Sequence, residues 1–303
     1  EELRHLVLKE KTIASLIQPQ YHTMFESAAV PICTFTTRNI YMPRYEASFI
    51  KLTDFYGAER QPEKTLEAIN NGNCGWFYKA KPDAFQLIPG SPIVYWVSDA
   101  FRAIFKLSKV GDFLASDGQI LTGNNDLFLR LIWEVNSNTV GSNGNWKLHH
   151  KGGDFRKWCG NVEWVVAWGE EAREFFRKDK TARIPKEELW DLQGITWSTI
   201  TSSHSSFRKV MEDESFNKAA PTLITTRKEL IPLTLGALNS TVAQYIMSVI
   251  NPTLNCLVHD VESIPLALEN ISQKSIVSTT EACLHLASND WDAYERSWYF
   301  KSL

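Results

Sequence analysis

Apolar residues recur at helix and strand spacing from the start of the chain. Leu3, Leu6 and Val7 share one face of a helix predicted over Glu1–Glu10, and the apolar run Thr12–Ile17 predicts a buried strand. The chain starts without Met and already within this helical pattern. We therefore expect it to be an excised piece of a longer protein.

Two further strands are predicted at Ala28–Thr36 and Glu46–Leu52, and the turn residues within Ile40–Arg44 predict that they pair antiparallel. The order of a helix, a strand and a hairpin resembles the closing part of a mixed α/β sheet. A short helix is expected at Pro62–Ile69, where Pro lies in the first turn. Ser98 is the expected N-cap of the next helix.

The second half of the chain predicts short strands between longer helices. A charged helix is expected near Glu170–Lys180, and Leu233–Ile250 has the strongest helical period of the chain. That helix is expected to end at Asn251-Pro252, because the residue before Pro disfavours the helical conformation. A further apolar-periodic helix is predicted at Ser272–Ala287. The strands are expected near Arg130–Glu134, Trp146–His149, Val162–Val166, Gly194–Thr199 and Thr222–Thr225.

Composition narrows the classes of function. The 303 residues suffice for one large or two ordinary domains, and 44% of them are hydrophobic. The net charge of −3 excludes nucleic-acid binding by overall charge, so any such binding needs a local basic face. Five cysteines, an odd number with no CxxC pair, argue against zinc and disulfides and for a reducing cytoplasm. No signal peptide or membrane-spanning run is evident.

A polar loop between two glycines is the first candidate site. Within Gly118–Arg130, the amides of Gln119, Asn124 and Asn125 can bond bidentately to adenine. Thr122 suits phosphate, and Arg130 suits phosphate or guanine. The alternative is that Asn124 and Asp126 only cap a turn. Residue types alone leave these two interpretations equal.

A basic segment around two glycines, Lys147–Lys157, is the second candidate. Its backbone amides at Gly152-Gly153 can approach phosphate while Lys151, Arg156 and Lys157 neutralise charge. Trp158 offers a ring for stacking on a base, although a core position for it is the stronger interpretation. The alternative for the whole segment is a solvated hairpin. His149-His150 lacks neighbours at metal-ligand spacing, and we expect no metal site.

A hydroxyl-rich stretch, Thr196–Arg208, is the third candidate, and its Ser203 and Arg208 suit phosphate contacts. A polar loop without chemistry is nearly as good an interpretation. An independent hydrolase has only these serines in its favour, because no GxSxG turn accompanies them. The cations of Glu170–Lys186 are interpreted by default as a solvated helix face, and the second interpretation is a flank that contacts phosphate. The chain also lacks GxGxxG, a P-loop and Asn-Pro-Pro-Tyr/Phe, so it completes no active site by itself.

Ten segments carry a family resemblance. They are Ala29–Phe35 (AVPICTF), Leu52–Ala58 (LTDFYGA), Lys64–Ile69 (KTLEAI), Gly90–Val97 (GSPIVYWV), Gln119–Arg130 (QILTGNNDLFLR), Lys151–Asn161 (KGGDFRKWCGN), Gly194–Ser198 (GITWS), Leu238–Tyr245 (LNSTVAQY), Asn251–Asn255 (NPTLN) and Asp290–Lys301 (DWDAYERSWYFK). In this order they resemble the PglX (BrxX) family of adenine-specific DNA methyltransferases from BREX phage-defence systems, and the match extends over nearly the whole chain. The turn of Gly, Thr and Asn followed by a late Leu-Asn-Ser helix is also similar to the specificity region of TaqI-type methyltransferases.

The resemblance implies an α/β (α+β) chain in three parts. Residues 1–105 would carry the last strands of a Rossmann-like methyltransferase sheet and a connector, 106–265 a target-recognition domain, and 266–303 a helical tail. The S-adenosylmethionine site and the catalytic motif would lie upstream, so the piece alone would be inactive. Two positions depart from the family pattern: Cys159 replaces an aromatic residue, and Leu127 replaces a basic one, which shifts a phosphate contact to Arg130.

The function implied is the DNA-sequence-reading part of a site-specific, S-adenosylmethionine-dependent N6-adenine methyltransferase in a prokaryotic cytoplasm. Its partners would be double-stranded DNA and other BREX proteins, with no membrane. The alternative is a protein-interaction module of a defence complex that does not read DNA, for which the aromatic tail Trp291–Phe300 argues.

Overall fold

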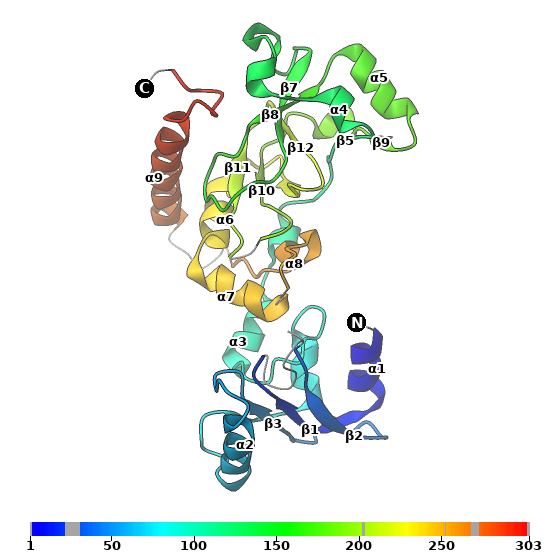
Figure 1. Ribbon diagram of the computed structural model, residues 1–303, viewed down its shortest axis with the longest axis vertical. Coiled ribbons are helices and arrows are strands. Elements are labelled where there is room, and N and C mark those ends of the chain that lie inside the picture. The colour runs from blue at the N-terminus through cyan, green and yellow to red at the C-terminus, as the bar shows by residue number, and fades with distance from the viewer. Residues whose placement is uncertain (1, 22–30, 202–203, 252, 268–272, 302–303) are drawn as a thin grey trace. The chain divides into compact units, whose positions relative to one another are not determined.

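The computed structural model describes residues 2–21, 31–201, 204–251, 253–267 and 273–301 (Figure 1). The chain divides into two compact units, Glu1–Lys106 and Leu107–Leu303. Each unit contains its own mixed sheet or sheets and its own helices, which confirms the predicted α+β class. The assignment of 1–105, 106–265 and 266–303 to three functional parts stays a prediction.

The first unit is built on a four-stranded sheet with the order β2-β1-β3-β4. Strand β1 pairs parallel to β3, and the two outer pairs are antiparallel. Phe49 on β3 is fully buried, where its ring stacks on Tyr95 at 4.6 Å. The strands are β1 (Thr12–Gln18), β2 (Thr34–Arg38), β3 (Ala47–Lys51) and β4 (Phe77–Ala80), and the helices are α1 (Glu2–Glu10), α2 (Arg60–Asn70) and α3 (Asp99–Ala103).

The predicted hairpin between β2 and β3 is wrong, because β1 lies between these two strands. All five residues of β2 are exposed, whereas Ala47, Phe49 and Ile50 of β3 are buried. A polar strand suits the sheet edge, and an apolar strand suits the centre. The predicted N-cap at Ser98 is confirmed, since its Oγ accepts a hydrogen bond from Phe101 N at 3.1 Å.

The second unit contains a four-stranded sheet, a three-stranded sheet and a two-stranded ribbon (Figure 1). Their orders are β12-β7-β8-β6, β11-β10-β13 and β5-β9. Gly194 in the central strand β10 is required by packing, because a Cβ there would lie 2.6 Å from Leu223 O. The strands are β5 (Leu121–Thr122), β6 (Leu129–Leu131), β7 (Trp146–His150), β8 (Trp164–Ala167), β9 (Ala182–Arg183), β10 (Gly194–Thr196), β11 (Arg208–Val210), β12 (Glu214–Phe216) and β13 (Thr222–Ile224).

Helices surround these sheets, and α9 (Gln273–Asp292) packs along α6 (Leu230–Leu238). The close approach of α9 depends on Gly236, whose missing Cβ would lie 2.4 Å from Thr280 Oγ1. The remaining helices of the unit are α4 (Asn125–Phe128), α5 (Glu170–Lys178), α7 (Thr241–Ile250) and α8 (Val258–Glu262), with 3₁₀ turns at Val110–Asp112, Ile132–Glu134, Ser137–Thr139 and Glu187–Leu189.

The single helix predicted over Leu233–Ile250 is wrong. The segment forms α6 and α7, which are bent by 68° at a break. Ser240 starts α7 as its N-cap by accepting a hydrogen bond from Ala243 N at 3.1 Å. Both helices are rich in apolar residues, so the apolar pattern of the sequence does not reveal the break between them.

Candidate nucleic-acid interface

The first candidate loop is held by its own polar side chains. Thr122 Oγ1 donates to Asn125 Oδ1 at 2.7 Å, and Asn124 Oδ1 accepts from Leu127 N at 3.2 Å. Asn124 therefore caps α4, which was the alternative interpretation, yet its side chain remains exposed. Gly123 has φ +68°, and a Cβ there would lie 2.6 Å from Thr181 Oγ1. The loop is thus preorganised before it meets any partner.

The two residues at the ends of this loop, Gln119 and Arg130, are less exposed than Asn124 and Asn125. Arg130 is half-buried, and its Nη1 donates to two backbone carbonyls, Asp126 O at 2.7 Å and Leu129 O at 2.6 Å. Gln119 is also half-buried, next to Ile120, whose N–H donates to Phe216 O at 2.9 Å. The bond from Ile120 ties the start of the loop to β12, while the bonds of Arg130 hold the end of the loop to itself.

Three cations of the second candidate loop, Lys147–Lys157, each contact a different part of the protein. Lys151 Nζ lies 3.9 Å from the ring centroid of Trp164. Arg156 pairs with Asp290 of α9 at 2.8 Å, and Lys157 Nζ donates to Asn239 O at 2.8 Å. Arg156 and Lys157 therefore brace the loop against α9 and the end of α6, while Lys151 lines open cavities described below.

Trp158 and Arg208 lie side by side in a short parallel bridge, with Trp158 N donating to Phe207 O at 2.8 Å. Trp158 is half-buried and has φ +76°. Arg208 is fully buried, and this burial, with a smaller effect from Arg156, lowers its pKa to about 10. Arg208 Nη1 donates to Arg156 O at 3.3 Å, so its guanidinium orders the loop from inside.

Three adjoining cavities bring these loops together along one surface of the second unit. The first has a volume of about 410 Å³ and is lined by Thr122, Asn125 and Lys151 among others. The second, of about 440 Å³, shares Lys151 and Lys218 with the first. The third, of about 160 Å³, shares Ser198 with the second. We call these three cavities the furrow.

The furrow collects parts of all three predicted loops. The residues that line it are Ile120, Leu121, Thr122, Gly123, Asn125, His149, Lys151, Gly152, Gly153, Asp154, Phe155, Thr181, Ser198, Thr199, Ile200, Thr201, Ser206, Asn217, Lys218 and Ala219. Gln119, Asn124, Arg130, Arg156, Lys157, Trp158 and Arg208 do not line it. Ser203 lies outside the described residues.

Sequence reasoning missed Asn217, Lys218 and Thr181. Asn217 Oδ1 accepts from Ala219 N at 2.9 Å, so Asn217 shapes the turn that presents Lys218. A signal for this turn existed in the pattern Asn-Lys-Ala-Ala-Pro over 217–221. The sequence does not predict that this turn lies beside Lys151. That position follows from the parallel pairing of β12 with β7.

His149 lines the first cavity although none of its surface is exposed. Ser215 Oγ donates to Leu148 O at 2.9 Å, so it accepts from His149 Nδ1 at 2.9 Å. Nε2 then carries a lone pair, and no hydrogen-bond partner meets it among the described residues. Burial, with smaller effects from His150 and Lys151, lowers the pKa of His149 to about 3, which keeps it neutral at physiological pH.

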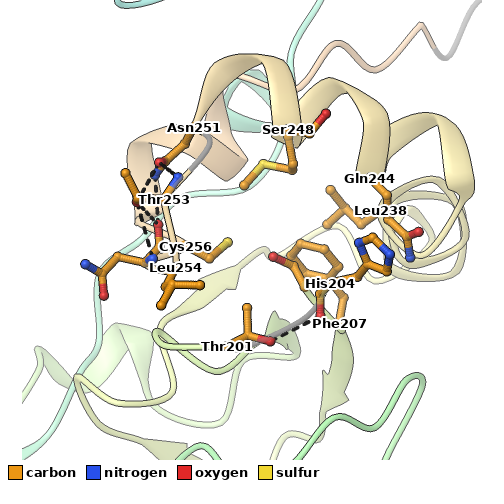
Figure 2. A pocket seen from close by; sticks show the side chains of 13 residues that line it. Thr201, His204, Phe207, Leu238, Gln244, Ser248, Asn251, Thr253, Leu254 and Cys256 are labelled. Carbon is orange, nitrogen blue, oxygen red and sulfur yellow. Dashed lines mark hydrogen bonds between the residues drawn. The ribbon is translucent and has the colours of Figure 1, made fainter. Parts of the chain in front are cut away.

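A further cavity, of about 210 Å³, lies between the hydroxyl-rich loop and α7 (Figure 2). His204 and Phe207 line one side, and Gln244 and Ser248 of α7 line the other. Asn251 organises the turn at its end, where its Nδ2 donates to Asp260 Oδ2 at 2.6 Å. This cavity is small and shares only Thr201 with the furrow.

Among the described residues, no three His, Cys, Asp or Glu side chains gather where they would hold a metal ion. Within the same residues, no single helix has the length and apolarity needed to cross a membrane; α6 and α7 pass that test only as a bent pair.

Two bacterial proteins are similar to the chain over most of its length. The adenine-specific methyltransferase PglX of Lacticaseibacillus casei (strain Zhang) is 28% identical over 289 residues, which cover 89% of this chain and 24% of that protein. The adenine-specific methyltransferase BrxX of Escherichia coli O9:H4 (strain HS) is 28% identical over 313 residues, covering 99% and 25%. The chain thus spans about a quarter of the length of the curated relatives it matches. No protein-family model matches it.

Two solved structures resemble the chain at low scores. The type IIL restriction-modification enzyme MmeI in complex with DNA has a TM-score of 0.45 and 13% identity, covering 98% of this chain and 40% of that one. The type IIG restriction endonuclease BpuSI has a TM-score of 0.35 and 9% identity, covering 92% and 39%. Neither score is high enough to define the fold of this chain.

Proposed function

We propose that this chain, a homologue of the adenine-specific methyltransferases PglX and BrxX, is the DNA-reading part of an S-adenosylmethionine-dependent N6-adenine methyltransferase in a BREX phage-defence system. The observation that carries the proposal is the furrow, in which two lysines, amide side chains and hydroxyls from separate loops line adjoining cavities. Groups of this kind bind phosphates and base edges.

Amide side chains of the first loop are the proposed base contacts. Asn or Gln can bond to N6 and N7 of adenine at once, which distinguishes adenine from other bases in the major groove. Asn125 lines the furrow, and exposed Asn124 precedes it on the same turn. Gln119 is the third proposed contact, and its half-buried position limits it to the edge of the loop.

Lysines give the furrow its affinity for phosphate in this proposal. Lys151 and Lys218 both line the first two cavities, and Thr122 lines the first. Arg156, Lys157 and Arg208, proposed from sequence as phosphate contacts, bond to the protein itself and support the loops that carry Lys151 and Gly153. Phosphate contacts by Arg130 and Ser203 and base stacking by Trp158 are proposed from the sequence alone.

Methyl transfer itself is assigned to residues outside this chain. S-adenosylmethionine supplies the methyl group, and the target adenine is flipped out of the duplex to receive it. The chain contains no GxGxxG turn and no Asn-Pro-Pro-Tyr/Phe motif. Its own contribution is to select and position the DNA. A cytoplasmic location and other BREX proteins as partners follow from the same proposal.

Salt-dependent DNA binding tests the proposal. Fluorescence anisotropy of the full-length protein with a labelled duplex gives the slope of log affinity against log salt. Lys151→Ala with Lys218→Ala should weaken binding and reduce that slope by about 2, since each phosphate contact contributes about 1. Lys186→Ala with Lys274→Ala, which removes two lysines that line none of the furrow, is the matched control. Equal slopes for both double variants would contradict the proposal.

A protein-binding module is the second candidate, because Tyr294 and Tyr299 of the aromatic tail are half exposed. Trp291 of the same tail is buried in its own unit, which reduces the surface left for a partner. Binding to a defence-system protein that persists at high salt, without any binding to DNA, would favour this candidate.

A further inference from the structure

Two exposed apolar side chains lie at the third cavity of the furrow, where the other lining groups are polar or glycine. Phe155 is 54% exposed and Ile200 is 70% exposed. Both line this cavity of about 160 Å³ together with Asp154, Ser198 and Thr201 among others. Exposed apolar side chains are common on this chain, and these two differ in lining one polar cavity together.

Hydrogen bonds hold the two loops that carry these side chains. Ser198 Oγ donates to Gly153 O at 2.9 Å and so ties the loops together. On one side, Asn161 Nδ2 donates to Asp154 O at 2.8 Å. A backbone bond from Thr201 N to Leu254 O at 3.1 Å holds the other side. The backbone next to each apolar side chain is therefore fixed, and neither is displayed by a loose loop.

The cavity continues a surface suited to a polyanion. Its neighbour in the furrow is lined by Lys151 and Lys218 and shares Gly153, Ser198 and Ile200 with it. A DNA backbone drawn to the lysines would bring the adjacent base steps to Phe155 and Ile200. Around them, Ser198, Thr201 and Ser206 make the rest of the wall polar, which suits the DNA backbone better than an apolar peptide face.

We propose that Phe155 and Ile200 form an apolar wedge that inserts between neighbouring base pairs of the bound DNA. This inference rests on the proposed function and adds to it a device that distorts the duplex. Separating two stacked base pairs exposes their flat apolar faces, and an aromatic ring and a branched aliphatic chain can cover those faces. An enzyme that acts on an extruded base benefits from such unstacking.

Fluorescence of 2-aminopurine reports the unstacking directly. The full-length protein is mixed with duplexes that carry this base at successive positions across the bound site. Wild-type protein should raise the fluorescence at one step, and Phe155→Ala with Ile200→Ser should lose most of that rise. Affinity should fall about tenfold, the equivalent of one lost base–aromatic stack. Tyr294→Ala and Leu286→Ser, 50% and 69% exposed in the wild type, are the matched controls and should change neither signal.

A mismatch at the affected step separates the wedge from a merely structural role. DNA that is already unstacked needs no wedge, so the affinity defect of the double variant should shrink on mismatched duplex. An unchanged fluorescence rise in the double variant, or an equal defect on matched and mismatched DNA, would overturn the wedge while leaving the proposed function intact. Wild-type protein that fails to bind any duplex would overturn the proposed function instead.

Discussion

Ser198 donates a hydrogen bond from its Oγ to the backbone carbonyl of Gly153 at 2.9 Å. The two residues are 45 positions apart and belong to the hydroxyl-rich loop and the basic loop. Arg208 Nη2 lies 3.3 Å from the same Oγ, so one hydroxyl joins two loops and a buried guanidinium. The shape of the furrow depends on this joint.

Ser198→Ala should loosen this joint. We expect a loss of about 1–2 kcal/mol in the free energy of unfolding, because a buried Arg donor and a carbonyl lose their shared partner. Chemical denaturation of the full-length protein measures it. Ser248→Ala is the control, since Ser248 Oγ donates only within its own helix, to Tyr245 O. Equal stability of the two variants would show that the joint contributes nothing.

Replacing Asn239 should lower the free energy of unfolding more than replacing an ordinary residue at the end of a helix. Its Oδ1 accepts from Phe207 N at 3.1 Å, and its Nδ2 donates to Phe207 O at 2.9 Å, both buried. Asn239→Ala leaves Phe207 N without this acceptor, while Phe207 O keeps its bond from Trp158 N, and we expect a cost of about 1–3 kcal/mol. Thermal unfolding of the variant should show a lower midpoint. Asn239→Asp retains the acceptor, so a smaller loss from Asp than from Ala is expected.

His149 should make stability depend on pH. Its pKa is lowered from 6.5 to about 3 in the folded protein, so the unfolded state binds the proton more readily. This contribution to stability is fully present above about pH 6.5 and is lost as pH falls toward 3, by about 1.4 kcal/mol per pH unit. His149→Asn should reduce the slope of unfolding free energy against pH. His204→Asn, at an exposed histidine, should retain the wild-type slope, and a retained slope in His149→Asn would contradict the assignment.

Thiol reactivity should follow burial. Burial raises the pKa of Cys159 to about 11 and that of Cys256 to about 12, whereas Cys33 is exposed. Because the thiolate is the reactive form, iodoacetamide at pH 8 should label Cys33 at least about tenfold faster than Cys159 or Cys256. Peptide mass spectrometry over time measures the three rates. Rapid labelling of Cys256 would show that its surroundings are open, and Cys33→Ser should remove the fastest reaction.

Local signals in the sequence predicted local structure well. The helix at α1, the strand at β7 and the N-cap at Ser98 follow from apolar spacing and capping chemistry, and the structure confirms them. The pairing of β2 was wrong because the choice between a hairpin and an intervening strand depends on burial across the sheet. The break at Ser240 was missed because apolar residues continue from α6 into α7, so the apolar pattern does not stop where the helix does.

The candidate site, too, could be predicted from the sequence only in its local parts. The three loops could be found as polar segments, but their meeting along one furrow is a tertiary property. Arg208 illustrates the difference: its place at the end of a hydroxyl-rich stretch suggested an exposed cation, yet its strand buries it beneath the loops. Lys218 is the opposite case. Nothing in the sequence marks this single Lys as part of the site, and it lies in the furrow because β12 pairs with β7.

We propose that this chain selects the DNA sequence to be methylated. Sequencing DNA from cells that express the full-length enzyme maps the methylated adenines and so measures this selection. Asn124→Ser with Asn125→Ser keeps an oxygen to cap α4 and removes both amides. Asn136→Ser with Asn138→Ser is the matched control, because Asn136 caps another exposed turn. We predict that the first double variant loses or relaxes its methylation motif while the control retains it. An unchanged motif and extent of methylation in both double variants would show that Asn124 and Asn125 do not read the DNA sequence.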